Sequence, residues 1–511
     1  MGAGKGGAKS AAASLTAMTV KGFVWAFTGT IAQALLQVVS MVVLSRLLDK
    51  TEFGAAQAAG LVIGLSQVVS QLGVGPALVQ RKTLNDREIS AAFYSSLLLS
   101  GVLALLLVAV APWVNPLLSL PRDSTLLPLL TVALVCAGAA AAPMGLLQRQ
   151  LRFREMAMVD VLAFGPATIG VSVLLALLDF GAASLVWGQI AGGLTTAIGY
   201  HLLARMSLRP ESPVAMWRSV RPLLGFGAWY SISQLGNWSA LNADNFVTVN
   251  VLGTGSFGVY SRAYNLLAQP ANVIGTAVDK ALFPAMAKAK DDGERLRRAY
   301  VRSASLVALL TVPLSVVIWV LAPEIVGIML GQRWLEVVVP LQIFALVLLP
   351  RASYKISGSL TRATGAVSGG AWRQWLYAAE VFVGCAIGTR WGINGVAVGA
   401  SVAIVLHFLI MLRFSERVAR GLMRSVLAMY TKHVPVALVS FAAAESVALA
   451  VRPVGPMVRP VGPMFLTVVA VGVAWAIATV AAVVLLRRFF QAELDVVLSL
   501  VRSRRSGSKL A

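Results

Sequence analysis

Long apolar stretches alternate with short polar connections along almost the whole chain. A helix needs about 20 mainly apolar residues to cross a bilayer. Windows of that kind fall at 19–46, 54–79, 89–115, 125–147, 157–179, 182–204, 222–250, 257–285, 301–328, 335–360, 368–388, 392–412, 430–451 and 464–486. Short connections leave little backbone unpaired in lipid. The pattern predicts an all-α, polytopic membrane protein of about 14 transmembrane helices.

Basic residues gather in alternate connections between these windows. The basic clusters lie near residues 5–21, 81–87, 149–154, 205–221, 288–302, 362–373, 413–432 and 487–509. The intervening connections hold few basic residues or none. Because cytoplasmic connections are enriched in Lys and Arg, the alternation predicts an even number of spans with both termini in the cytoplasm. We therefore expect a multi-pass membrane protein.

Composition then narrows the classes of protein that fit. The 511 residues are 58% hydrophobic and 13% charged, against roughly 25% charged in ordinary globular chains. The net charge of +22 follows from topology, and no soluble basic stretch is long enough to fold as a nucleic-acid-binding domain. Two cysteines and three scattered histidines exclude a disulfide scaffold and a structural zinc site. We expect no metal and no cofactor.

Two segments about 204 residues apart resemble one another. The first is LLDKTEFGAAQAAG, with Phe53-Gly54 opening a helix, and the second is VLGTGSFGVYSRAY, with Phe257-Gly258 in the same place. An offset of six spans keeps both copies in one orientation and predicts two six-helix lobes related by a parallel repeat. The predicted domains are a disordered cytoplasmic tail (1–18), an N-lobe (19–206), a cytoplasmic linker (207–220), a C-lobe (221–413), two extra spans (414–490) and a basic cytoplasmic tail (491–511).

Polar residues inside the spans are the candidate functional residues. Span seven carries Gln234, Asn237, Trp238, Asp244 and Asn245, and span eight carries Arg262, Asn265, Gln269, Asp279 and Lys280, in each case within an arc of about 120°. Span one adds Gln33 and Gln37, and later spans add Arg351, Lys355 and Glu380. Such residues either line a wet cleft or join helices by hydrogen bonds. A static Arg262–Asp244 ion pair is the corresponding alternative for the charged residues.

The expected cleft is cationic, rich in amides and flanked by Trp229, Tyr230, Trp238, Tyr260 and Tyr264. An arginine side chain recognises phosphate with two parallel hydrogen bonds, and aromatic faces stack on sugar rings. The chemistry therefore favours a substrate with phosphates and hydroxyls. A cleft for hydrophobic cations would be acidic.

Several strings, in order along residues 20–430, resemble a known family. They are FGAAQAAG (53–60), GVGPALVQR (73–81), RQLRFREMA (149–157), FGAASLVWGQIAGG (180–193), RPLLGFGAWY (221–230), NADNFVTVNVLGTGSFGVYSRAYNLLAQP (242–270), LFPAMAK (282–288) and LGQRWLEVVVPLQIFAL (330–346). The chain resembles the polysaccharide-transport family, the Wzx-like oligosaccharide flippases, of the multidrug/oligosaccharidyl-lipid/polysaccharide exporter superfamily.

The resemblance implies a flippase rather than an enzyme. It implies alternating access of two lobes that translocate undecaprenyl-diphosphate-linked oligosaccharide units for lipopolysaccharide, capsule or exopolysaccharide. It implies membrane lipid and polysaccharide polymerase machinery as partners, and Na⁺ or H⁺ as the coupling ion with Asp244, Asp279 and Glu380 as candidate acids. Family members bind the lipid diphosphate through cavity arginines, and Arg262 in the SRAY string is the matching position. The first half departs from related peptidoglycan-precursor flippases, because it lacks obvious intramembrane arginines.

Three other functions predict different sequence features. A cation-coupled multidrug exporter of the same superfamily predicts an acid-dominated cleft. A membrane polymerase or ligase predicts a large external loop with catalytic charges, whereas the longest external connection here spans about a dozen residues. A membrane scaffold leaves the polar stripes unexplained.

Overall fold

The computed structural model describes residues 25, 28–70, 78, 84–206, 208, 213–288, 292–363, 367–452 and 461–485. Within these ranges the elements are helices, and each of the fourteen predicted windows overlaps helical residues. Residues 19–24, 26–27, 71–77, 79 and 486 of these windows lie outside the described residues. Nine of the described helices are long and apolar enough to cross a membrane, or ten if one bent pair counts as a span. The all-α, polytopic membrane class predicted from the sequence is confirmed. The chain divides into two compact units, Met1–Gly258 and Val259–Ala511.

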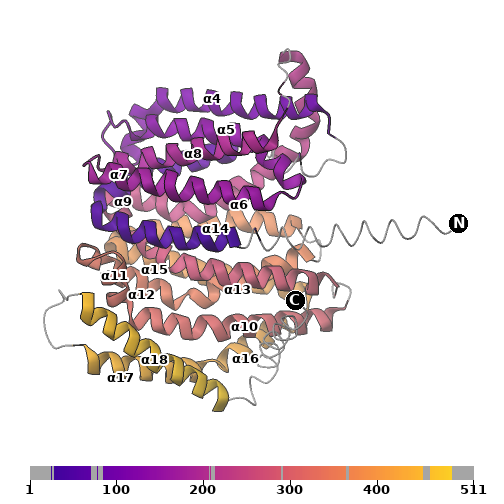
Figure 1. Cartoon of the computed structure of the whole chain (residues 1–511). Coiled ribbons are helices and arrows are strands. Elements are labelled where there is room, and N and C mark those ends of the chain that lie inside the picture. Colours follow the sequence, from indigo (N-terminus) through magenta and orange to yellow (C-terminus); the bar gives the residue numbers. More distant parts are fainter. Residues whose placement is uncertain are drawn as a thin grey trace, which may run out of the picture. The chain divides into compact units, whose positions relative to one another are not determined.

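The first unit is a bundle of roughly parallel and antiparallel helices (Figure 1). Its helices are Thr28–Leu47, α2 (Lys50–Ser70), α4 (Asp86–Leu117), α5 (Leu126–Arg149), α6 (Phe153–Leu162), η1 (Ala163–Gly170, a π-helix), α7 (Val171–Leu177), α8 (Ala182–Ala204) and the first part of α9 (Pro213–Lys288). Helix α5 packs against α2, α4 and α8. Side chains such as Ile63, Leu130 and Ile190 form the shared core.

A break at Gly253 divides α9 into two helices. Gly253 has φ 83° and ψ 172°, a conformation that glycine adopts without steric cost. The second part of α9 then begins beside the start of α2. A Cβ on Gly54 would lie 1.8 Å from the Thr254 carbonyl oxygen, and a Cβ on Gly258 would lie 2.2 Å from the Lys50 carbonyl oxygen. The two Phe-Gly strings of the repeat therefore pack backbone to backbone in the first unit.

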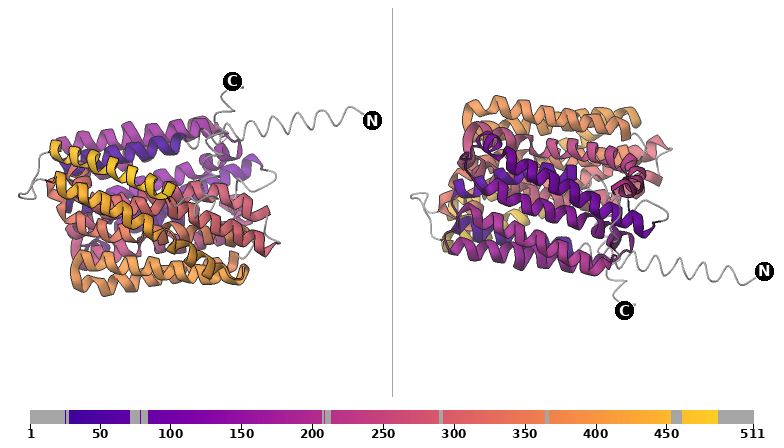
Figure 2. Two further views of the ribbon diagram at one scale, coloured as in Figure 1. Left: turned by 90° about the horizontal axis from the view of Figure 1, so that it is seen from below. Right: turned by 90° about the horizontal axis from the view of Figure 1, so that it is seen from above.

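The second unit contains the remaining helices. After the second part of α9 they are α10 (Gly293–Val320), α11 (Ala322–Met329), η2 (Gln332–Val337), α12 (Val338–Leu346), α13 (Leu348–Ala363), α14 (Val367–Gly388), η3 (Thr389–Trp391), α15 (Gly392–Val418), α16 (Leu422–Thr431), α17 (Val434–Val451) and α18 (Val461–Leu485). Helices α17 and α18, yellow in Figure 2, pack side by side. The main core joins α10, α13, α15 and α16 through residues such as Tyr300, Ile356 and Phe408. The domain boundaries expected from the sequence stay a prediction.

Glycines bring α14 and α15 into backbone contact. A Cβ on Gly399 would lie 2.1 Å from the Gly384 carbonyl oxygen, and one on Gly388 would lie 2.2 Å from the Gly395 carbonyl oxygen. Small residues four apart on both helices allow this close approach, which is how helices associate without a hydrophobic driving force. The crossing fixes the spacing of side chains on these two helices.

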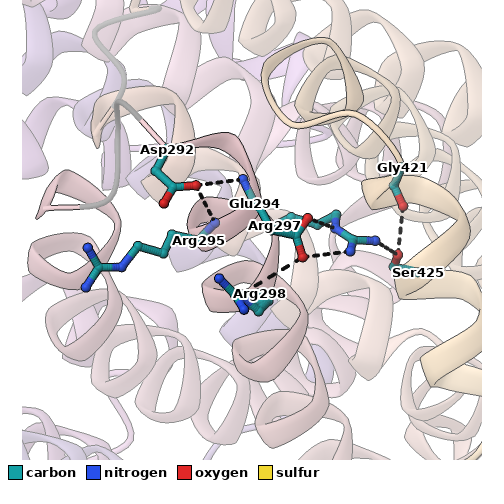
Figure 3. A network of polar contacts seen from close by, with 7 residues as sticks. All are labelled: Asp292, Glu294, Arg295, Arg297, Arg298, Gly421 and Ser425. Atoms are coloured by element: carbon teal, nitrogen blue, oxygen red, sulfur yellow. Dashed lines mark hydrogen bonds and ion pairs between the residues drawn. The ribbon is translucent and has the colours of Figure 1, made fainter.

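A polar network anchors the start of α10 to α16 (Figure 3). Asp292 caps α10 by accepting hydrogen bonds from the backbone N–H groups of Glu294 and Arg295. Arg297 pairs with Glu294 at 2.9 Å and donates to the Ser425 hydroxyl at 3.0 Å. Several of these contacts are exposed, so the network forms without burial.

Large apolar side chains cover the outside of both units. Examples are Leu105, 74% exposed, Trp113, 72% exposed, and Leu485, 82% exposed. A soluble protein seldom exposes so much contiguous apolar surface. These side chains therefore face lipid, and the protein is a multi-pass membrane protein.

Candidate functional site

A broken helix in the second unit provides the frame of the candidate site. Helices α12 and α13 meet at an angle of 48° after Leu346. Val347 leaves helical geometry, and Pro350 follows in the first turn of α13, where its missing N–H breaks no helical bond. Interrupted spans mark binding sites in transporters, since they bring helix ends into the membrane.

Arg351 lies in this first turn of α13 and is 6% exposed. Its guanidinium carbon lies 4.4 Å above the ring centre of Tyr264 on α9. Its Nη2 donates to the Tyr264 hydroxyl at 2.8 Å. Its buried Nε has no hydrogen-bond partner among the described residues. The nearest groups around Arg351 are thus neutral and aromatic.

Lys355 lies one turn further along α13. Its Nζ donates to the Asn272 side-chain oxygen on α9 at 3.0 Å. Asn272 is exposed and Lys355 is half-buried. Two predicted site residues, Arg351 and Lys355, are therefore brought to one face of α13 beside α9.

Arg262 occupies a more enclosed place on α9. It is 4% exposed, and its guanidinium carbon lies 5.7 Å from the ring centre of Trp334 in η2. Asn265 and Gln269 follow on the same helix and are half-buried. Arg262 thus contacts aromatic surface in this conformation.

The candidates of the first unit spread over two helices. Gln33 and Gln234 are half-buried, whereas Gln37 and Asn237 are exposed. The indole nitrogen of Trp238 lies 3.0 Å from where a Cβ of Gly64 on α2 would stand.

Asp244 and Asn245 form a local arrangement on α9. Asp244 is 3% exposed and accepts from the Asn245 backbone N–H at 2.8 Å. The Asn245 amide donates to the Asn242 side chain at 3.2 Å. The Arg262–Asp244 ion pair and the wet cleft considered from the sequence stay predictions, because those residues belong to different units. The side chains of Asp279 and Lys280 lie outside the described residues.

Glu380 forms a separate buried group with a residue that sequence reasoning missed. Its Oε2 lies 3.6 Å from His407 Nδ1 on α15. Tyr377 and Tyr354 contact the His407 ring, with ring centres 4.3 Å and 5.5 Å away. The sequence indicates one part of this group, because Tyr377 and Glu380 are three residues apart and therefore share a helix face. No sequence pattern indicates His407, because its partner Glu380 comes from the neighbouring helix α14.

Known proteins resemble this chain in sequence and fold. Residues 43–339 match the model of a family described as polysaccharide biosynthesis protein. The lipopolysaccharide biosynthesis protein WzxC of Escherichia coli (strain K12) is 26% identical over 357 residues, covering 69% of this chain and 72% of that protein. The succinoglycan biosynthesis transport protein ExoT of Rhizobium meliloti (strain 1021) is 26% identical over 307 residues, covering 60% and 61%.

A solved structure shares the fold at low sequence identity. It is the lipid II flippase MurJ in an inward closed conformation, with a TM-score of 0.68 and 13% identity over 91% of this chain and 99% of that one. The likeness confirms the two-lobed helical architecture predicted from the sequence.

Proposed function

Because this chain belongs to the polysaccharide biosynthesis protein family, we propose that it flips undecaprenyl-diphosphate-linked oligosaccharides across the bacterial inner membrane. The membership confirms the resemblance found in the sequence strings. A relative named as a transport protein of polysaccharide biosynthesis supports transport rather than catalysis. The oligosaccharide units would serve lipopolysaccharide, capsule or exopolysaccharide synthesis.

The observation that carries the proposal is Arg351 at the break between α12 and α13. An arginine within a span costs at least about 2.5–3.5 kcal/mol on insertion scales. Among the described residues Arg351 contacts tyrosine and no carboxylate. A cation retained at this cost without a carboxylate partner suits an anionic ligand. The positive end of α13 adds to its field, and the guanidinium can hold a phosphate with two hydrogen bonds.

Neighbouring side chains extend the anion site toward the sugar. Lys355 and Asn272 would hold the second phosphate, with Arg262 and Lys280 offsetting the desolvation cost of the head group as it moves. In the second unit the amides of Asn265 and Gln269 would contact sugar hydroxyls. For the candidates of the first unit, contacts with sugar hydroxyls and rings stay a prediction from the sequence; these are Gln33, Gln37, Gln234, Asn237, Trp238 and Asn245. The polyprenyl tail would stay in lipid.

Transport would proceed by alternating access of the two lobes, with both termini in the cytoplasm. The coupling ion would be Na⁺ or H⁺, and Asp244, Asp279 and Glu380 are the candidate acids. Polymerase machinery at the outer leaflet would take up the product. A cationic site is unsuited to the cationic substrates of a multidrug exporter, because like charges repel in low dielectric.

The test replaces Arg351 in cells whose polymer export depends on this protein. Arg351→Gln should lower export at least tenfold at equal protein level, and Arg351→Lys should fall between, because lysine keeps the charge and loses the planar donor fork. Arg390→Gln is the matched control, since it removes an exposed arginine of η3. Polymer is measured outside the cell and lipid-linked oligosaccharide inside. Wild-type export by Arg351→Gln would refute the role of this residue.

A further inference from the structure

Glu380 and His407 form a buried titratable pair in the second unit. The Glu380 side chain is 8% exposed and the His407 side chain 2%. The 3.6 Å between Oε2 and Nδ1 is longer than a hydrogen bond. Among the described residues neither atom has a hydrogen-bond partner. Two ionisable groups thus lie together inside the bundle, and one proton on either group leaves the pair with no net charge.

Aromatic rings connect this pair to Arg351. His407 stacks on Tyr377 at 4.3 Å with an interplanar angle of 27°, and Tyr354 meets His407 edge-on at 5.5 Å. Tyr354 is three residues after Arg351 on α13, so both side chains share one helix face. Tyr354 therefore contacts His407 of the pair and shares a helix face with Arg351 of the proposed anion site.

The surrounding helices carry further titratable groups, both neutral and charged. Helix α13 adds the cation Lys355, and α9 contributes Tyr264. The Tyr300 hydroxyl of α10 forms a hydrogen bond with the Ser357 hydroxyl, and the Tyr430 hydroxyl of α16 donates to the Ser353 hydroxyl. Helix α12 has no titratable side chain in its sequence. The carboxylates of these helices bind elsewhere, since Glu294 of α10 pairs with Arg297 and Glu416 of α15 accepts from the backbone N–H groups of Gly421 and Met423. Arg351 and Lys355 of α13 are therefore the charges that we assign to the surroundings of the pair.

Electrostatics ties the proton of the pair to the charge on Arg351. With one proton the pair is neutral overall, either as carboxylate and imidazolium or as acid and imidazole. Without it the pair carries one negative charge, which in a low-dielectric interior acts strongly on nearby cations. That negative charge would offset Arg351 and compete with a bound anion. A protonated pair leaves Arg351 available.

We propose that Glu380 and His407 form a proton-binding site whose occupancy strengthens anion binding at Arg351. By reciprocity, anion binding draws a proton onto the pair. The identity of the anion as a lipid diphosphate rests on the proposed function, whereas the proton site rests on the pair itself.

The linkage is tested on the full chain in lipid nanodiscs. The probe is a short-chain polyprenyl diphosphate-linked monosaccharide, whose phosphates keep their charge across about pH 5–8, the range in which histidine titrates. Its Kd should rise about tenfold from the acidic to the basic end, a typical coupling between two sites. Calorimetry in two buffers of different ionisation enthalpy should show proton uptake on binding. A pH-independent Kd without proton uptake in the wild type would overturn the linkage.

Variants separate the pair from other titrating groups. Glu380→Gln mimics the protonated acid, so the Kd should stay at the tight, acidic value at every pH. His407→Gln should move the midpoint, because Glu380 then titrates without its basic neighbour. Glu445→Gln on α17 removes a carboxyl outside this cluster and should keep the wild-type profile. A wild-type pH profile in Glu380→Gln would also overturn the inference.

Infrared spectroscopy distinguishes failure of this inference from failure of the proposed function. A carboxyl or imidazolium band that titrates in the wild type and is lost or shifted in Glu380→Gln supports the proton site without any ligand. If that band is present but no diphosphate probe binds at any pH, the proposed function is overturned and the proton site stands. If the probe binds but Glu380→Gln leaves the band unchanged, the proton site is overturned and the function stands.

Discussion

Replacing Gly399 with alanine should destabilise the second unit by forcing α14 and α15 apart. The new Cβ would lie 2.1 Å from the Gly384 carbonyl oxygen and 2.5 Å from its carbon. Real Cβ atoms essentially never come closer than 3.0 Å to another heavy atom, so the helices must separate by about 0.9 Å. Both contacting atoms belong to the backbone, so no side-chain rotation relieves the clash.

The size of the effect follows from two opposing terms. Overpacking a close contact costs about 1–3 kcal/mol, while Gly→Ala in a helix gains up to about 1 kcal/mol of intrinsic propensity. Gly472→Ala on α18 is the matched control, since no atom lies within 4 Å of its new Cβ. The control should therefore be neutral or slightly stabilising. Because the propensity gain is the same in both variants, Gly399→Ala should lower the apparent Tm relative to that control by about 2–12 °C, at roughly 2–4 °C per kcal/mol for a unit of this size.

The assay is thermal unfolding of the purified protein in detergent, followed by tryptophan fluorescence or by loss of the monodisperse gel-filtration peak. Gly384→Ala acts on the same crossing, where its Cβ would lie 2.7 Å from the Gly399 carbonyl oxygen. The double variant should therefore lose less than the sum of the single losses, because one separation relieves both clashes. Equal Tm values for Gly399→Ala and Gly472→Ala would refute the crossing.

Two further predictions use contacts elsewhere in the chain. Gly54→Ala should destabilise the first unit by about 1–3 kcal/mol, because the new Cβ overpacks against the Thr254 carbonyl oxygen. Gly60→Ala on the same helix should not destabilise it, because no atom lies within 4 Å of the new Cβ. Thermal unfolding measures both variants, and equal losses of stability would contradict the packing. Arg452 donates to both carboxylate oxygens of Glu324, at 2.9 and 3.0 Å, and Glu324 is only 1% exposed. Glu324→Gln should lower the free energy of unfolding by about 2–4 kcal/mol, because the charge of Arg452 is then uncompensated. Adding Arg452→Gln should recover part of that loss in the same assay, and a double variant less stable than Glu324→Gln would contradict the ion pair.

The sequence predicted the helices well, for a physical reason. Lipid leaves helices as the main solution for an apolar chain, so hydropathy alone located all fourteen windows. Arg351 and Lys355 are candidates from the sequence because a charge inside a span differs from its apolar surroundings, and their role in a site stays a prediction. The burial of Arg262 against Trp334 was not predicted, because it depends on the connection between α11 and α12. His407 was missed for the same kind of reason, since its partner Glu380 comes from a helix that only the glycine crossing brings within reach.

The two halves of the repeat share a backbone plan and differ where the chemistry is concentrated. Helix α5 is a continuous helix from Leu126 to Arg149, although it contains Pro143. The span six positions later is broken into α12 and α13. A break inside a membrane frees carbonyl groups that must find donors, and the Ser315 hydroxyl donates to the Ala345 carbonyl at 2.7 Å beside it. In the broken span, Ser315 thus supplies a donor at the break, and Arg351 lies in the helical turn that follows it. The matching helix α5 of the first unit is unbroken and carries no charge before Arg149 in its last turn.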